Sequence, residues 1–377
     1  MSGDSILDVD GEQRPVEAEP AAEAGPGGPG NPGGPGGPAE VPAVPPRRRR
    51  RARRILLISL AVVVVLLAGV SLTAVLYLRS VDHSVKRIDA FDDVPATSRP
   101  SPVPEALGAE NILMLGSDTR DPANTTGSRS DTIILAHLPK DRSSAQLVSI
   151  PRDTWLHIPK APNGPYGNTT AKINAAYAWG GVPLVVQTVE SFTGVRIDHV
   201  VVVDFSGFKE IIDALGGVDI YVDHAFTSTH SLNKDGRRTF AAGQQHMDGA
   251  AALDYSRERY SFADGDFARI KHQQQMITAV LDKASSAGVL SNPLRLNALL
   301  KATANAVQID KTLSLFDLAN QLRNVRSGNL KFFTSPSKGT GMVGDQSVVF
   351  ADDAKAKVLY DAIRRDAVQE ILGAGTD

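Results

Sequence analysis

The chain has 377 residues, of which 22% are charged, and its formal net charge is -2 at pH 7. This near balance excludes a general attraction to polyanions, so any anion site must be a local cluster of cations. The absence of cysteine excludes disulfides and thiol chemistry, and it leaves the hydrophobic core to stabilise the fold unaided.

The first 54 residues do not have the composition of a folded domain. Residues 1–46 are rich in Pro, Gly and Glu and include GPGGPGNPGGPGGP at 25–38. Such a segment buries too little apolar surface to offset the entropy of ordering, so we predict disorder. A flexible spacer is the simpler interpretation, and a partner-binding arm is the alternative. The segment ends in the basic run RRRRRARR at 47–54.

An uncharged apolar run follows these arginines directly. Residues 55–78, ILLISLAVVVVLLAGVSLTAVLYL, are long enough to cross the roughly 30 Å hydrocarbon core of a bilayer as one helix. A basic run before such a helix holds the N-terminus in the cytoplasm, so we predict a cytoplasmic tail at 1–54 and an extracellular location from residue 79 onward. A cleaved signal peptide is less favoured, because its apolar region is shorter and lies nearer the N-terminus.

Beyond the predicted membrane helix, the Pro- and Ser-containing segment 79–109 is expected to be an extracellular linker, and residues 110–370 one folded domain. Strand-length apolar runs occur at 111–115, 132–138, 145–150, 198–205, 218–222 and 329–333. Helical patterns occur at 183–193, 205–215, 267–281, 291–307, 313–325 and 352–366. Near-continuous apolar strands separated by helices predict a sheet covered on both faces, and therefore an α/β domain with three α/β/α layers.

Three of the predicted strands adjoin an Asp and an Arg. The sequences are GSDTR at 116–120, SRSDT at 128–132 and SIPRDTW at 149–155. Because ligands of α/β proteins gather at strand ends, we expect Asp118, Asp131 and Arg152 to share one pocket. Two carboxylates there suit Mg²⁺ or Mn²⁺. Taken alone, the loose spacing of the two aspartates favours turn or capping roles, which are the commonest for Asp in such loops.

The stretch DYSRERYSFADGDFARIKHQQQ at 254–275 concentrates cations and amide donors. Arg257 and Arg259 would share a face if the chain is extended there. The aspartates of DGD are suited to start a helix, on which Arg269 and Gln273 lie one turn apart. Guanidinium groups bind phosphate oxygens through paired hydrogen bonds and keep their charge, so a diphosphate fits this cluster. A solvated arginine face balanced by nearby acidic residues is the alternative.

Eight segments of this chain resemble, in order, the motifs of the LytR-CpsA-Psr family of bacterial envelope proteins, over about residues 110–280. Eight motifs in the right order are far more specific than any single one. The segments are NILMLGSDTR, SRSDT, SIPRDTW, KINAAYAWGG, TGVRIDHVVVVDFSGF, DALGGVDI, LDYSRERY and DGDFARIKHQQQ.

The resemblance implies a phosphotransferase. Such an enzyme takes an anionic cell-wall glycopolymer from a polyprenyl diphosphate carrier and joins it to peptidoglycan through a phosphodiester bond, typically at the C6 hydroxyl of N-acetylmuramic acid. The family's fold encloses the polyprenyl tail in an apolar tunnel. Moving a phosphoryl group requires metal and guanidinium groups that neutralise charge on its oxygens, which agrees with the composition of the motifs.

Site residues carry over from the family by motif. Asp118 and Asp131 would hold the Mg²⁺ or Mn²⁺ ion, and with Arg129 and Arg120 they form the expected catalytic set. The base that removes the hydroxyl proton stays open, because a carboxylate bound to a metal is a poor base. The residues expected to bind the diphosphate are Arg129, Arg152, Arg257, Arg259, Arg269 and Gln273.

Two other functions stay open from the sequence. The same pocket with water in place of the sugar hydroxyl would be a polyprenyl diphosphate phosphatase. A non-enzymatic lipid-binding scaffold or regulator of the envelope is the second alternative. Nucleic acid is not an expected partner, because the basic run serves membrane topology and the domain faces outward. The motifs do not choose among teichoic acid, teichuronic acid, arabinogalactan and capsule as the polymer.

Overall fold

The computed structural model describes residues 64, 76–77, 79–118, 130–229, 237–262 and 265–373. Apart from Val64 they belong to one compact unit, Leu66–Asp377. The predicted tail 1–54 lies outside the described residues, and so does the predicted membrane helix 55–78 except for three of its positions. In the part of the chain that the structure describes, no helix is long and apolar enough to cross a membrane.

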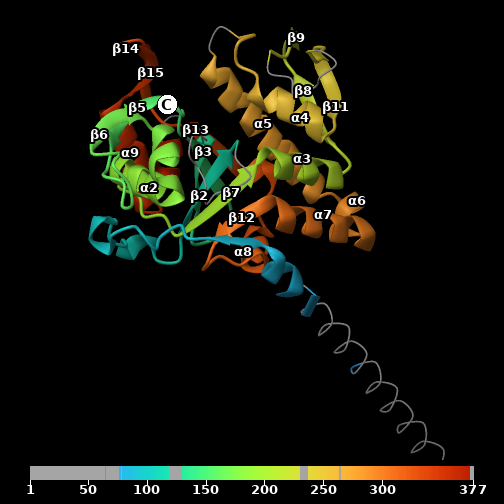
Figure 1. Cartoon of the computed structure of the whole chain (residues 1–377). Helices are drawn as coiled ribbons and strands as arrows, with labels where there is room; N and C mark the ends of the chain where they lie inside the picture. Colours follow the sequence, from blue (N-terminus) through green and yellow to red (C-terminus); the bar gives the residue numbers. More distant parts are fainter. Residues whose placement is uncertain are drawn as a thin grey trace, which may run out of the picture. The chain divides into compact units, whose positions relative to one another are not determined.

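A seven-stranded mixed sheet forms the centre of the domain (Figure 1), in the strand order β1-β12-β7-β2-β3-β4-β13. Strands β2, β3 and β4 are successive antiparallel neighbours, while β7 runs parallel to β2. Five of the six predicted strands lie in this sheet, and the sixth, β8, pairs elsewhere. The bounds are β1 Lys86–Ile88, β2 Glu110–Ser117, β3 Ser130–Leu138, β4 Ala145–Ser149, β7 His199–Asp204, β12 Val307–Asp310 and β13 Leu330–Thr334.

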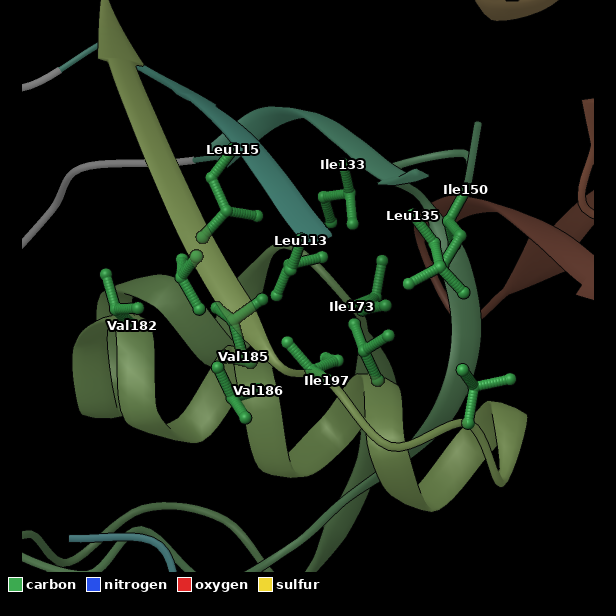
Figure 2. Close-up of a cluster of buried hydrophobic side chains, with 14 of the residues drawn as sticks. Leu113, Leu115, Ile133, Leu135, Ile150, Ile173, Val182, Val185, Val186 and Ile197 are labelled. Atoms are coloured by element: carbon green, nitrogen blue, oxygen red, sulfur yellow. The ribbon is translucent and has the colours of Figure 1, made fainter. Parts of the chain in front are cut away.

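Helices cover both faces of the central sheet, as predicted. Leu113, Leu115 and Ile133 point toward α2 on one face (Figure 2), where α9 also contributes side chains to the core. Ile112 and Ile134 point to the other face, where α5, α7 and α8 contribute side chains to a second core. Since successive side chains of a strand point to opposite faces, burial on both sides explains the near-continuous apolar runs. The bounds are α2 Ala175–Thr193, α5 Asp266–Ala284, α7 Pro293–Ala306, α8 Leu315–Leu322 and α9 Asp353–Arg364.

A four-stranded sheet beside α2 was not predicted from the sequence. Its order is β14-β15-β5-β6, and β5 and β6 contact the helix. The strands β6 (TTAK) and β14 (SKGTGMV) are polar and partly exposed, so they lack the apolar runs by which strands are recognised. The bounds are β5 Thr154–Ile158, β6 Thr169–Lys172, β14 Ser337–Val343 and β15 Gln346–Ala351.

A third core lies between α5 and a group of short elements. It contains Ile212 of α3, Val218 of β8, Met247 of β11 and Tyr255 of α4, and β8 pairs antiparallel with β11. The bounds are α3 Phe205–Ala214, β8 Val218–Val222, β9 Phe226–Thr227, β10 Thr239–Phe240, β11 Gly243–Met247, α4 Gly249–Arg257, α6 Ala287–Leu290 and α10 Val368–Gly373.

The segment 79–109, predicted to be a linker, contributes to the domain. Its strand β1 pairs with β12 at the edge of the central sheet. Val85, Ile88, Ala90 and Val94 are buried in the cores on the two faces of that sheet. The folded part therefore begins before Glu110. We predicted a linker because this segment contains prolines. The structure shows that four of its apolar side chains pack in the hydrophobic cores.

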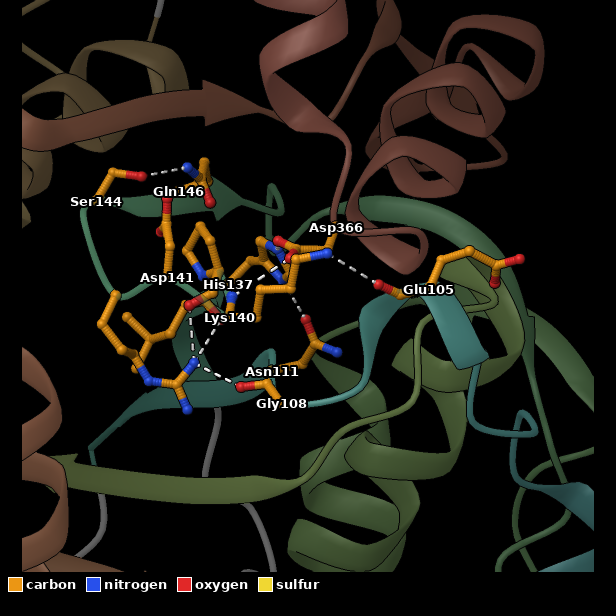
Figure 3. Close-up of polar contacts among 12 residues, drawn as sticks. Glu105, Gly108, Asn111, His137, Lys140, Asp141, Ser144, Gln146 and Asp366 are labelled. Carbon is orange, nitrogen blue, oxygen red and sulfur yellow. Dashed lines mark hydrogen bonds and ion pairs between the residues drawn. The ribbon is translucent and has the colours of Figure 1, made fainter.

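A buried polar network joins the end of α9 to the central sheet (Figure 3). The ring of His137 lies between two residues, with Nδ1 2.8 Å from Asn111 Oδ1 and Nε2 3.0 Å from Asp366 Oδ1. Burial lowers the pKa of His137 even though the Asp366 carboxylate opposes this. The network fixes the position of α9 against β3, and α9 in turn covers the face of the sheet that carries α2.

His272 of α5 lies inside an aromatic cluster. Its ring centroid is 4.3 Å from that of Tyr255 and 4.9 Å from that of Phe262, and the ring stacks on Phe226 at 5.9 Å. Burial there lowers the pKa of His272 to about 4. An imidazole held neutral in the fold makes stability depend on pH.

We predict that the free energy of unfolding falls as pH drops from about 6.5 to 4. In this window the unfolded chain binds a proton at His272 and the folded chain does not, which costs about 1.4 kcal/mol per pH unit and about 3 kcal/mol in all. Urea titrations across this range should show a flatter profile for His272→Phe. His157, which is exposed on β5, supplies the control variant His157→Phe. Equal slopes for wild type and His272→Phe would contradict the assignment.

Candidate active site

Asp118 and Asp131 lie at the same edge of the central sheet. Asp118 follows β2, and Asp131 is near the start of β3. The pairing of Ser117 with Ser130 and of Gly116 with Thr132 leaves Asp131 as the extra residue of a bulge. Asp118 is exposed and Asp131 half-buried. The backbones of Asp118 and Asp131 therefore lie at one edge of two adjacent strands, where the sequence placed the two carboxylates.

The side chain of Tyr177, in the first turn of α2, is buried near this edge. Burial raises the pKa of Tyr177, and the nearby charges of Asp118 and Asp204 raise it further. Asp204 ends β7, and its carboxylate accepts a hydrogen bond from the Gly207 backbone at 2.8 Å, so that it caps α3. The ends of β2 and β7 thus place two carboxylates near one buried tyrosine.

Arg152 lies just beyond β4 and bridges several carboxylates. Its Nη1 donates to Asp131 Oδ1, and its Nε is 3.6 Å from Asp153 Oδ2 and 3.8 Å from Asp266 Oδ1. Burial works to lower the pKa of Arg152, but these carboxylates, Asp131 foremost, outweigh burial and raise it. The structure thus brings Arg152 and Asp131 together in an ion pair.

Asp266, the first residue of α5, is surrounded by guanidinium groups. Its Oδ2 is 2.9 Å from Arg269 Nη2, and its Oδ1 is 3.9 Å from Arg259 Nη1 and 3.8 Å from Arg152 Nε. Burial raises the pKa of Asp266, although the arginines oppose this, and burial lowers the pKa of Arg269. One carboxylate is thus shared by three cations, which leaves positive charge in excess at this point.

The segment that carries Arg257 and Arg259 differs from the expected extended chain. Arg257 is the last residue of α4, and Arg259 lies in the loop that follows. The two guanidinium groups therefore diverge in their contacts: Arg257 packs 4.4 Å over the ring of Phe205, and Arg259 packs 4.4 Å over the ring of Tyr260. Sequence spacing misread the helix end, because SRERY contains no aliphatic residue by which helical periodicity could be recognised.

Gln273 lies on the next turn of α5 after Arg269, as predicted. Its Nε2 donates to Thr132 Oγ1 of β3 at 2.9 Å. This bond joins α5 to the strand that carries Asp131. It brings the helix of the arginine cluster and the edge with the two aspartates into one site.

Several buried polar atoms of this cluster have no hydrogen-bond partner among the described residues. Three are guanidinium nitrogens: Arg152 Nε, Arg257 Nη1 and Arg269 Nε. The fourth, Asp266 Oδ1, is an acceptor. Buried polar groups in proteins are nearly always satisfied, so guanidinium donors of this kind are suited to bind a group rich in anionic oxygens.

Arg120 and Arg129, both predicted as catalytic residues and the second also as a diphosphate ligand, lie outside the described residues. Their roles stay predictions. Among the described residues, no group of three or more His, Cys, Asp or Glu side chains could hold a metal. Two carboxylates at one edge nevertheless fit Mg²⁺, which commonly takes one or two carboxylates from the protein and completes its shell with water and substrate phosphate.

A pocket of about 980 Å³ opens beside the cluster. Arg152, Arg259 and Asp266 form its charged side. The other walls come from the start of α2, the loop after α4 and the unpredicted four-stranded sheet. They are lined by Asp153, Ala171, Lys172, Asn174, Ala175, Ala178, Trp179, Tyr260, Phe262, Gly265, Phe267, Gly339, Thr340, Gln346, Ser347, Val348 and Val349.

Sequence reasoning missed two acidic residues that organise the site. It treated Asp266 as a helix start and Glu258 as surface charge. Glu258 is fully buried and accepts hydrogen bonds from the backbone N–H groups of Arg259 at 3.0 Å, Tyr260 at 2.8 Å and Ser261 at 3.1 Å. It also accepts from the backbone and hydroxyl of Thr229. One sign of this role is present in the sequence, where Glu258 stands between Arg257 and Arg259.

These contacts hold the Arg259 loop in place, and they lower the pKa of Glu258 against the opposing effect of its burial. We predict that Glu258→Ala costs about 3 kcal/mol of stability, because several buried donors lose their acceptor. Glu258→Gln should cost less, since one oxygen can still accept. Thermal unfolding with hydrogen exchange of residues 259–261 measures both effects. Unchanged protection of that loop in Glu258→Ala would show that it does not depend on the carboxylate.

Comparison with known proteins places this architecture in one family. The LytR_cpsA_psr family model matches residues 75–365. The cell wall biosynthesis protein LcpA of Corynebacterium glutamicum is 32% identical over 66% of this chain and 54% of its own length. The polyisoprenyl-teichoic acid–peptidoglycan teichoic acid transferase TagU of Enterococcus faecalis is 33% identical over 62% of this chain and 72% of its own.

A solved structure agrees with these relatives. The crystal structure of Bacillus subtilis TagV superposes with a TM-score of 0.57 and 27% identity, over 69% of this chain and 97% of that one. The chain spans about half the length of LcpA, so the match concerns the domain described here. The predicted resemblance and the mixed α/β fold are both confirmed, and the chain belongs to the LytR_cpsA_psr family.

Proposed function

We propose that this protein transfers an anionic cell-wall glycopolymer from a polyprenyl diphosphate carrier to peptidoglycan. The observation that carries the proposal is a set of buried guanidinium nitrogens on Arg152, Arg257 and Arg269 that have no hydrogen-bond partner among the described residues. They lie next to the edge that bears Asp118 and Asp131. A diphosphate supplies the oxygens that such donors lack. The relatives named as teichoic acid transferases support the same reading.

The reaction is a substitution at phosphorus. A hydroxyl oxygen of peptidoglycan, with C6 of N-acetylmuramic acid as the expected position, forms a bond to the phosphorus that carries the glycopolymer. The bond from that phosphorus to the bridging oxygen breaks, and polyprenyl monophosphate leaves with the electron pair. The hydroxyl proton passes to a base. The product is a phosphodiester between polymer and glycan, so no oxidant or further reactant is required.

The guanidinium groups are the part of this chemistry that the chain itself supplies. Arg152, Arg257, Arg259 and Arg269 would bind nonbridging oxygens and offset charge that builds up on the leaving phosphate. Asp118 and Asp131 would hold Mg²⁺ or Mn²⁺, which when bound neutralises further phosphate charge. The ion pair of Asp131 with Arg152 would keep the carboxylate oriented toward the diphosphate.

We propose Asp266 as the acceptor of the hydroxyl proton. Its Oδ1 is buried, lacks a hydrogen-bond donor among the described residues and belongs to a residue that lines the pocket. Burial raises its pKa, which makes a carboxylate a better base. Asp118 and Asp131 are poorer candidates, because a metal would occupy their lone pairs.

We predict that Arg257→Ala abolishes transfer while the domain stays folded. Losing one buried guanidinium at a developing phosphate charge should cost at least about a hundredfold in rate. Full-length protein in nanodiscs, lipid-linked donor and uncrosslinked peptidoglycan fragments would be incubated, and the covalent polymer–glycan product measured by mass spectrometry. Asp131→Ala should behave in the same way. Arg364→Ala, whose side chain pairs with Asp361 on the surface of α9, is the matched control.

The same assay tests the metal and the main rival function. Chelation should stop product formation, and Mg²⁺ or Mn²⁺ should restore it in wild type but not in Asp131→Ala. If wild type releases phosphorylated polymer without any polymer–glycan adduct, water is the acceptor and the protein is a phosphatase. Undiminished transfer by Arg257→Ala would remove the diphosphate assignment.

We further propose that residues 55–78 anchor the protein in the cell membrane, with residues 1–54 in the cytoplasm and the catalytic domain outside. The support is the run of 24 uncharged residues directly after RRRRRARR. An outward domain would meet both the lipid-linked donor and peptidoglycan. We predict that protease added to intact cells lacking their wall degrades the domain and spares an N-terminal tag. Protection of the domain would contradict this topology.

A further inference from the structure

We infer that the pocket beside the guanidinium cluster is a carbohydrate subsite that binds the acceptor glycan of peptidoglycan, with Trp179 as its aromatic platform. The inference rests on the proposed function and names the part of the site that receives the second substrate. None of the residues predicted from the motifs accounts for the aromatic side of this pocket. The aromatic side of the pocket is therefore the part of the site for which the proposed function names no ligand.

The chemistry of the walls is that of a sugar site. Trp179, Tyr260 and Phe262 offer aromatic surface, and Lys172 and Gln346 offer hydrogen-bonding groups. A pyranose ring presents C–H groups on its faces and hydroxyls around its rim, so it needs both kinds of wall at once. A polyprenyl chain needs only the first kind. The volume of about 980 Å³ suits a stretch of glycan.

Trp179 is held on the wall by a break in α2. The next two residues, Gly180 and Gly181, have non-helical dihedrals, and Gly181 has φ of +61°. A Cβ at Gly180 would lie 2.6 Å from Leu184 Cβ, so no side chain fits there. The break separates the turn that carries Trp179 from the rest of the helix. The indole ring stacks on Tyr166 with centroids 5.9 Å apart and planes at 18°, which fixes its orientation.

The direction of α5 distinguishes the acceptor side from the lipid side. Its first residue, Asp266, lines the pocket, and Arg269 and Gln273 follow on successive turns. Farther along, Ile277 and Leu281 pack on the apolar core beneath the central sheet. The helix thus runs from a polar, aromatic end to an apolar end, with the proposed diphosphate position between them.

Phosphoryl transfer requires that the attacking and leaving oxygens lie roughly in line. If polyprenyl phosphate leaves toward the apolar end of α5, the attacking hydroxyl must approach from the opposite side. The opposite side is the pocket. There the hydroxyl oxygen bonds to phosphorus, the bond to the bridging oxygen breaks, and the proton is placed next to Asp266.

The direct test is binding of the acceptor in the absence of donor. Full-length protein in nanodiscs would be titrated with a lipid-free tetrasaccharide of alternating N-acetylglucosamine and N-acetylmuramic acid by calorimetry. Trp179→Ala should weaken binding about tenfold, because the ring loses its stacking face. Trp179→Phe should retain affinity within about threefold. Equal affinity of wild type and Trp179→Ala overturns the inference.

A second pair of variants guards against a folding defect at Trp179. Tyr260 and Tyr221 are both 61% exposed, but only Tyr260 lines the pocket. Tyr260→Ala should weaken tetrasaccharide binding severalfold, and Tyr221→Ala should not change it. Weakening by both variants, or by neither, counts against the subsite.

Kinetics separate the acceptor from the first sugars of the donor, which share the same chemistry. Trp179→Ala should raise the KM for peptidoglycan fragments about tenfold and leave the KM for lipid-linked donor within about twofold. A rise for the donor alone overturns the acceptor assignment. The proposed function can fail independently: wild type that binds the tetrasaccharide through Trp179 yet yields no adduct has the subsite but is not a transferase. Transfer that is insensitive to Trp179 leaves the function and removes the subsite.

Discussion

The structure of the site depends on one electrostatic constraint, the burial of several guanidinium groups around too few carboxylates. Arg152, Arg259 and Arg269 all approach Asp266, and Arg152 also contacts Asp131 and Asp153. Burying a charge is costly unless it is paired, so the folded protein tolerates this excess only because other interactions hold the elements in place. The same excess makes the site receptive to a doubly charged phosphate group, whose binding would relieve it.

The remainder of the domain can be understood as the frame that keeps these cations together. The central sheet, buried on both faces, sets the ends of β2, β3 and β7 at one edge. The Gln273 bond to Thr132 ties α5 to that edge. Glu258 ties the Arg259 loop to Thr229, and the His137–Asp366 pair ties α9 to the sheet. Each link is a buried polar contact, which gives directional fixation that apolar packing alone does not provide.

The sequence could predict those features of the fold that have a signal in a short stretch of the chain. Strands such as 132–138 are apolar on both sides, and so they could be located from residue type alone. The Asp and Arg residues at strand ends could be placed together, because the ends of neighbouring strands lie along the same edge of a sheet. The extended reading of SRERY failed because a helix end of polar residues has no period, and the linker reading of 79–109 failed because prolines hid a short edge strand.

The part of the site that could not be predicted is the part built by long-range folding. The pocket wall from β14 and β15 comes from residues about 160 to 170 positions after Trp179, and β14 (SKGTGMV) is polar and contains two glycines. No window of the sequence connects them with the arginine motifs. The motifs identified the groups suited to neutralise phosphate, because Asp and Arg have a recognisable chemistry. The motifs also contain Trp179 and Tyr260, but nothing local in the chain indicated that these side chains line one pocket with β14 and β15.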